Sequence, residues 1–125
     1  MSVPVDLDRL AATLADFRGA YLITVGDDFR AHTVAVSAVL ADGRFTVGPV
    51  GNSSRRNASR HAEVTLLWPP HQPGGYTLIV DGREGGLTED GRLVVIPGRA
   101  VLHRRASAES PPTRPGCSDD CMPLA

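Results

Sequence analysis

Apolar positions follow a helical spacing at the start of the chain and a strand spacing after Gly19. The helical set consists of Leu7, Leu10, Leu14 and Phe17. Asp6, directly before this set, is a candidate capping residue. We therefore expect a short amphipathic helix within residues 4–17 that ends near Gly19.

From Gly19 onward, β-branched runs alternate with turn signals. The expected strands cover residues 20–25, 32–40, 44–48, 63–68, 76–81, 92–96 and 99–104. Asp42-Gly43 is typical of a hairpin turn, and Asp90-Gly91 is a second candidate. The polar stretch 51–61 is predicted as a loop and a short helix. Because closure removes free strand edges, the pattern favours a mainly β (α+β) fold built as a small closed or partly closed antiparallel barrel of about six strands.

Composition narrows the possible functions. The 125 residues include 13 basic and 14 acidic side chains, a net charge of −1, and every basic residue is arginine. Without lysine, Schiff-base catalysis and a Walker-type phosphate loop are excluded. The near-zero charge argues against nucleic acid as a partner. No apolar run suggests a transmembrane helix and no leader segment stands at the N-terminus, so we expect a cytoplasmic protein that does not bind membranes.

The segment 48–57 carries the chemistry of a phosphate site. A strand ending in small residues feeds a helix start, which offers free backbone N–H groups. Two hydroxyls and two guanidinium groups stand at the same place, from Ser53, Ser54, Arg55 and Arg56. The alternative is that Asn52 or Ser53 only caps a helix whose arginines are solvated.

The histidines and the nucleophilic side chains form no recognisable catalytic or metal-binding pattern. His32, His61, His71 and His103 are far apart in the sequence, so no metal site is predicted. His32 begins a long strand, where it either approaches a ligand or is a polar residue at the rim. There is no Gly-x-Ser-x-Gly motif and no paired carboxylate, so no catalytic residue is assigned.

Residues 107–125 are rich in Ser, Pro and Gly, and we expect a flexible tail after a domain that spans residues 1–106. This tail holds Cys117 and Cys121. The two thiols are a reversible redox pair, two ligands of a shared metal site, or incidental.

The order of elements resembles the FMN-binding split β-barrel of the pyridoxamine 5′-phosphate oxidase-like flavoproteins, and in particular its small actinobacterial members. The resemblance covers about residues 5–105. It is carried by the leading helix, the strand 20–25, the hairpin 32–47 with its Asp-Gly turn, the segment 53–66 with Ser-Ser-Arg-Arg-Asn, the string Val-Thr-Leu-Leu-Trp-Pro-Pro, and the later Ala-Val-Leu-His-Arg.

The resemblance implies a six-stranded antiparallel split barrel with a short helix after the third strand, and a homodimer whose cleft holds the flavin ring. The implied cofactor-binding residues are His32, Thr33, Val34, Val36, Pro49, Val50, Ser53, Ser54, Arg55, Arg56 and Asn57. Of these, residues 53–57 surround the phosphate, and the others flank the ribityl chain or the ring. Where many members carry a basic residue in the phosphate helix this chain has Ser54, so the charge comes from Arg55 or Arg56.

The leading hypothesis is therefore a flavoprotein oxidoreductase that binds FMN, or alternatively a deazaflavin coenzyme, and transfers hydride to a small-molecule substrate. The chain lacks a C-terminal segment for pyridoxamine phosphate, so we do not expect that biosynthetic activity. One rival is a non-catalytic carrier of flavin or haem on the same barrel, and another is a structural protein without a cofactor.

Overall fold

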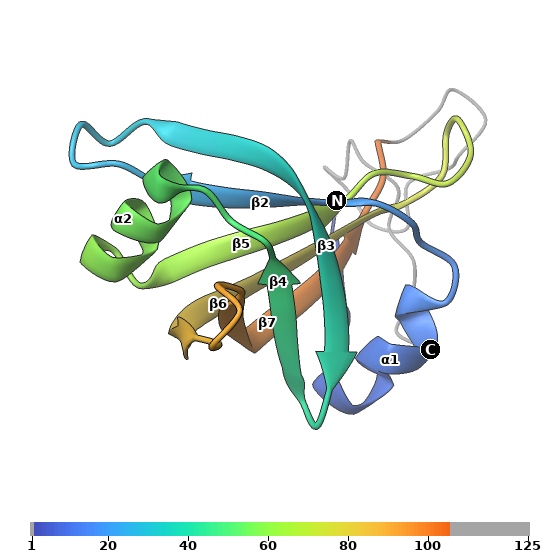
Figure 1. Ribbon diagram of the computed structural model, residues 1–125. Helices are drawn as coiled ribbons and strands as arrows, with labels where there is room; N and C mark the ends of the chain where they lie inside the picture. Colours follow the sequence, from blue (N-terminus) through green and yellow to red (C-terminus); the bar gives the residue numbers. More distant parts are fainter. Residues whose placement is uncertain (1, 106–125) are drawn as a thin grey trace.

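The computed structural model describes residues 2–105, and its architecture is a closed antiparallel barrel (Figure 1). The elements in chain order are β1 (Ser2–Val5), a 3-10 turn η1 (Leu7–Arg9), α1 (Leu10–Leu14), β2 (Ala20–Val25), β3 (Ala31–Ala41), β4 (Arg44–Gly48), α2 (Asn52–Arg60), β5 (Glu63–Trp68), β6 (Thr77–Leu87) and β7 (Leu93–His103). The mainly β fold and its two short helices are as the sequence predicts.

Six strands close the barrel in the order β7-β4-β3-β2-β5-β6, and β6 pairs with β7 to complete the ring. All the pairings are antiparallel. The strand β1 lies outside this ring and pairs with the C-terminal half of β7. The helix α1 lies at one end of the barrel, whereas α2 lies at the other end beside the β2–β3 loop (Figure 1).

Several boundaries differ from the sequence-based expectation. Residues 2–5 form a strand rather than the start of a helix, and α1 ends at Leu14. Asp6 stands before η1, but its side chain makes no capping hydrogen bond. The expected strands 92–96 and 99–104 are one strand, β7. A bulge at Gly98 shifts the register opposite Asp81 and Gly82, and β7 pairs with β6 on both sides of it.

The strand β6 extends through a run of glycines to Leu87, beyond the expected end at residue 81. Gly82 explains part of this extension, since a Cβ atom at that position would lie 2.7 Å from the Ile96 carbonyl oxygen. Only a residue without a side chain lets β6 and β7 approach so closely beside the bulge.

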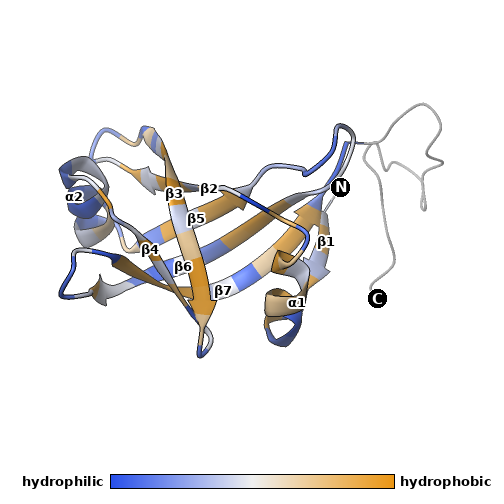
Figure 2. Ribbon diagram, turned by 45° about the vertical axis from the view of Figure 1, so that its right-hand side comes forward, coloured by the Kyte–Doolittle hydropathy of each residue, from blue (hydrophilic) through white to orange (hydrophobic). Residues whose placement is uncertain are grey.

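Inward-facing apolar residues from every barrel strand fill the interior. The fully buried large side chains include Leu22, Phe45, Leu66, Leu78, Val80, Leu93 and Val95. Phe45 and Trp68 pack with ring centroids 5.5 Å apart in a tilted arrangement. The strands carry most of the apolar residues, while α2 is largely hydrophilic (Figure 2). The polar side chains of α2 are therefore grouped at one end of the apolar barrel.

Within residues 2–105, no helix is long and apolar enough to cross a membrane. The predicted tail, with Cys117 and Cys121, lies outside the described residues.

Candidate functional site

The helix α2 is the element around which the candidate site is built. It follows directly on β4, and Gly51 occupies its N-cap position without a side-chain hydrogen bond to the first turn. The first N–H groups of a helix have no partner within the helix, so this end presents donors to the neighbouring space. The donors face the start of β3 across a hollow.

That hollow, here called the valine pocket, has a volume of about 350 Å³. Its walls are residues 32 and 34–36 of β3 and the connection from Pro49 to Ser54. Val34, Val36 and Val50 supply apolar surface, while Ser53 supplies a hydroxyl at the helix start. Ser54 also lines the pocket, but its side chain is buried. A group with one apolar and one hydrogen-bonding part matches such a lining.

A second hollow, here called the arginine pocket, has a volume of about 560 Å³ and lies on the other side of His32 and Ser53, which line both pockets. It is formed by the β2–β3 loop and one flank of α2. The lining residues are Gly26, Asp27, Asp28, Arg30, Ala31, His32, Ser53, Arg56, Asn57 and Arg60. Three guanidinium groups and two carboxylates therefore face the same space.

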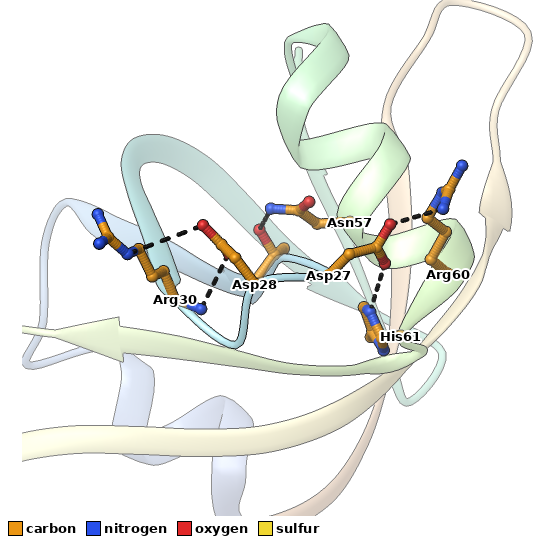
Figure 3. A network of polar contacts seen from close by, with 7 residues as sticks. Asp27, Asp28, Arg30, Asn57, Arg60 and His61 are labelled. Atoms are coloured by element: carbon orange, nitrogen blue, oxygen red, sulfur yellow. Dashed lines mark hydrogen bonds and ion pairs between the residues drawn. The ribbon is translucent and has the colours of Figure 1, made fainter.

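The acidic residues of the arginine pocket are paired with its cations (Figure 3). Arg60 donates a hydrogen bond to Asp27 over 2.6 Å, and His61 Nε2 lies 2.9 Å from the other oxygen of the same carboxylate. The hydrogen bond with His61, assisted by the Arg60 charge, lowers the pKa of Asp27 below its usual value of 3.8. Arg30 forms a longer pair with Asp28, at 3.8 Å.

Arg56 differs from the other two arginines of this pocket. Within residues 2–105 it makes no hydrogen bond and no ion pair, although it lines the pocket and is exposed. It is thus the guanidinium most available to an incoming anion.

The neighbouring Arg55 points elsewhere. Its Nη2 donates a hydrogen bond of 3.4 Å to the carbonyl of Gly91 in the β6–β7 loop, and its Nε is buried without a partner among the described residues. Arg55 lines neither pocket. Consecutive helical residues are turned by about 100°, so two adjacent arginines cannot both face β3.

Asn57 and Thr24 fix the position of α2 on the barrel. The Asn57 amide donates a hydrogen bond of 3.1 Å to the Thr24 hydroxyl, drawn as the dashed line from Asn57 in Figure 3. Both side chains are buried. These residues, with Ser54, are the buried polar side chains of the described chain. Asn57 therefore contributes to the wall of the arginine pocket mainly by holding the helix in place.

The predicted cofactor-binding residues fall into three groups. The two pockets bring together His32, Val34, Val36, Pro49, Val50, Ser53, Ser54, Arg56 and Asn57. Arg55 contacts the β6–β7 loop instead, and Thr33 is exposed on the outer face of β3. Alternation along a strand places Thr33 opposite to His32 and Val34.

Sequence reasoning missed the contribution of the β2–β3 loop, whose Asp27 and Arg30 line the arginine pocket. Arg60, which the sequence groups with Arg55 and Arg56 in one local arginine cluster, lines the same pocket. The spacing of Ser53, Arg56 and Arg60 at three and four residues is the signal that could have found this flank. Among the described residues, no group of histidine, cysteine or acidic side chains is arranged to hold a metal ion.

Comparison with known proteins gives two closely similar sequences. The chain is 49% identical over 132 residues to the uncharacterized protein Mb0449c of Mycobacterium bovis and, with the same values, to the uncharacterized protein MT0457 of Mycobacterium tuberculosis. Each alignment covers 94% of this chain and 93% of the relative. No protein-family profile matches the chain.

Proposed function

We propose that this chain, which belongs to the same family as the two mycobacterial proteins, is a flavin-binding oxidoreductase that holds the phosphate group of FMN, or of a deazaflavin coenzyme, between α2 and β3. The observation that carries the proposal is the joining of two complementary pockets at His32 and Ser53. One offers a hydroxyl beside apolar surface, and the other offers an unpaired arginine.

The residues present fit a phosphate monoester. An uncapped helix N-terminus attracts an anion through its N–H groups and its dipole. Ser53 adds a hydroxyl and Arg56 adds a charged donor on the same side of α2. The three donors come from one short helix, so one phosphate group is within reach of all of them.

The apolar walls of the valine pocket suit the part of the cofactor beyond its phosphate. Val34, Val36 and Val50 cover a planar ring or its chain and exclude water from one side of it. Bound FMN supplies the hydride chemistry, and the protein contributes anchoring and desolvation. His32, at the border of the two pockets, is placed to contact the chain between phosphate and ring.

We also propose that the active unit is a homodimer of the split-barrel type. The outer face of the barrel carries an uncharged row that crosses four strands in register, formed by Ala35, Tyr21, Leu67 and Ile79. Tyr21 is 40% exposed, and Val39 on the same side of β3 is 55% exposed. A second copy of the chain is the occupant expected for such a face, since paired barrels bury it by two-fold symmetry.

The direct test is titration of the full-length protein with FMN, followed by flavin fluorescence and absorbance. Riboflavin is the matched control because it has the same ring and lacks the phosphate. FMN is expected to bind at micromolar concentration or below, and about tenfold or more tightly than riboflavin, since charge-assisted hydrogen bonds to the phosphate contribute about 1.5–3 kcal/mol each. A parallel titration with the deazaflavin distinguishes the two cofactors.

Equal affinity for FMN and riboflavin would contradict the phosphate placement. No binding of FMN or of the deazaflavin would defeat the cofactor assignment. A Soret band on titration with haem, together with absence of flavin binding, would favour the carrier hypothesis, in which His32 is the candidate axial ligand. Sedimentation at micromolar concentration tests the dimer separately.

A further inference from the structure

The carboxylate of Asp27 lies among the cations of the arginine pocket and uses both of its oxygens there. One oxygen accepts the 2.6 Å hydrogen bond from Arg60, and the other lies 2.9 Å from His61 Nε2 (Figure 3). Asp27 belongs to the β2–β3 loop, whereas Arg60 and His61 stand at the end of α2. The contact therefore joins the two walls of the pocket.

Arg56 and Arg60 are one helical turn apart on the flank of α2 that faces this loop. An anion that binds Arg56 is accordingly within reach of the Arg60 guanidinium as well. Arg60 is already neutralised by Asp27, while Arg56 has no charged partner within residues 2–105. A ligand that engages both arginines must therefore take Arg60 from the carboxylate.

Breaking the contact between Arg60 and Asp27 destabilises the protein only slightly. The side chains of Arg60 and Asp27 are 58% and 57% exposed, and ion pairs of such exposure stabilise a fold only slightly. The displaced carboxylate keeps His61 as a partner, so it is not left without a hydrogen bond. Its neighbour Asp28 faces the same pocket but pairs with Arg30, not with α2.

We propose that Asp27 is an internal competitor for the anion that the arginine pocket binds, and that a phosphate monoester displaces it from Arg60. This inference rests on the proposed function of the same site. Because the carboxylate must leave Arg60 before an anion engages it, the contact lowers the affinity of every anion that needs both arginines by the same factor. A dianionic phosphate group binds a guanidinium more strongly than a carboxylate does, so it displaces Asp27 and still binds.

The experiment measures binding of inorganic phosphate and of acetate to the full-length protein by calorimetry at low ionic strength. Asp27→Asn removes the competitor, and Asp28→Asn is the matched control because it removes the same charge from the same pocket without touching Arg60. Asp27→Asn is expected to bind phosphate about two- to fivefold more tightly than the wild type. Asp28→Asn gives a smaller gain, from charge alone. Acetate binds more weakly than phosphate and is expected to gain from Asp27→Asn by a similar factor.

A second substitution separates competition from simple charge. Arg60→Gln is expected to weaken phosphate binding only slightly in the wild type, where Asp27 already occupies Arg60, and more strongly in the Asp27→Asn background. Tightening by Asp27→Asn with this non-additivity supports competition. Overturning results are weaker phosphate binding by Asp27→Asn, which would make Asp27 a positioning residue for Arg60, or equal gains in the two aspartate variants.

The two proposals fail in different ways. Phosphate binding that tightens in Asp27→Asn, without any flavin binding, supports the competitor and rejects the cofactor. FMN binding that is unchanged by Asp27→Asn supports the cofactor and rejects the competitor. Absence of phosphate and FMN binding in every variant rejects both.

Discussion

The two flanks of α2 differ in what they contact and in what they contribute. The flank toward the barrel buries Ser54, Asn57 and Ala58, and its polar contact is made with Thr24. The flank toward the β2–β3 loop exposes Ser53, Arg56 and Arg60. One flank of this nine-residue helix therefore attaches it to the barrel, and the other exposes its charged side chains. Substitutions on the first flank should change the stability of the fold, and substitutions on the second should change ligand affinity.

The largest effect is expected on the barrel-facing flank. Ala58 is 1% exposed, and Ala58→Asp would place a carboxylate without a partner in the core. We expect a loss of about 3–5 kcal/mol in the free energy of unfolding, measured by urea denaturation. Ser59→Asp is the control, since Ser59 is exposed and should change stability by less than about 0.5 kcal/mol. Similar unfolding free energies for the two variants would contradict the difference between the two flanks of α2.

On the opposite flank, Arg56→Gln should change binding and leave the fold intact. We expect FMN affinity to fall by about tenfold or more, because one charge-assisted contact to the phosphate is lost. Arg55→Gln is the matched control one residue away, since Arg55 faces the β6–β7 loop. Fluorescence titration of both variants measures the difference, and an equal loss in the two would contradict the assignment of Arg56 to the pocket.

Thr24→Val tests the hydrogen bond that attaches α2 to β2. Valine has nearly the same shape as threonine but leaves the buried Asn57 amide without its acceptor. The expected loss is about 1–3 kcal/mol in unfolding free energy. Thr33→Val provides the control because Thr33 is exposed on β3. If Thr24→Val proves as stable as Thr33→Val, the bond does not attach the helix.

The smallest expected effect is a change of stability with pH in the acid range. The pKa of Asp27 is lowered in the folded protein, chiefly by its hydrogen bond with His61, so its stabilising contribution is present above pH 3.8 and disappears as the pH falls through the folded-state value. The difference in Tm between wild type and Asp27→Asn should therefore shrink below pH 3.8. A thermal series from neutral to acid pH measures it. A constant difference would show that the carboxylate is not stabilised by its contacts.

Much of the fold could be predicted from the sequence because the patterns that specify most strands lie within the strands and the turns beside them. The strands β2, β3, β4 and β5 show regular alternation between turn signals, and their expected ranges agree closely with the structure. The strand β1 was missed since its four residues precede a helical pattern and their partner lies at the other end of the chain. The expected break between strands at residues 97–98 is a bulge that only the pairing with β6 reveals.

The residue types of the candidate site could be predicted from the sequence, but the direction in which each side chain points could not. The segment 53–57 could be identified as donor-rich, but which of Arg55 and Arg56 faces β3 depends on the rotation of α2 about its axis. That rotation is set by the buried contact between Asn57 and Thr24, two residues 33 positions apart. The pairing of Asp27 with Arg60 is equally a long-range contact, so no local pattern announced it.

The strand β7 also determines when the barrel can form during synthesis. It pairs with β4, β6 and β1, and its far end joins His103 to Ser2. Until β7 has been synthesised, β4 has no second neighbour and its edge is open to other chains. Folding should therefore begin with the local hairpins and finish late, with closure of the ring as the slow, non-local step.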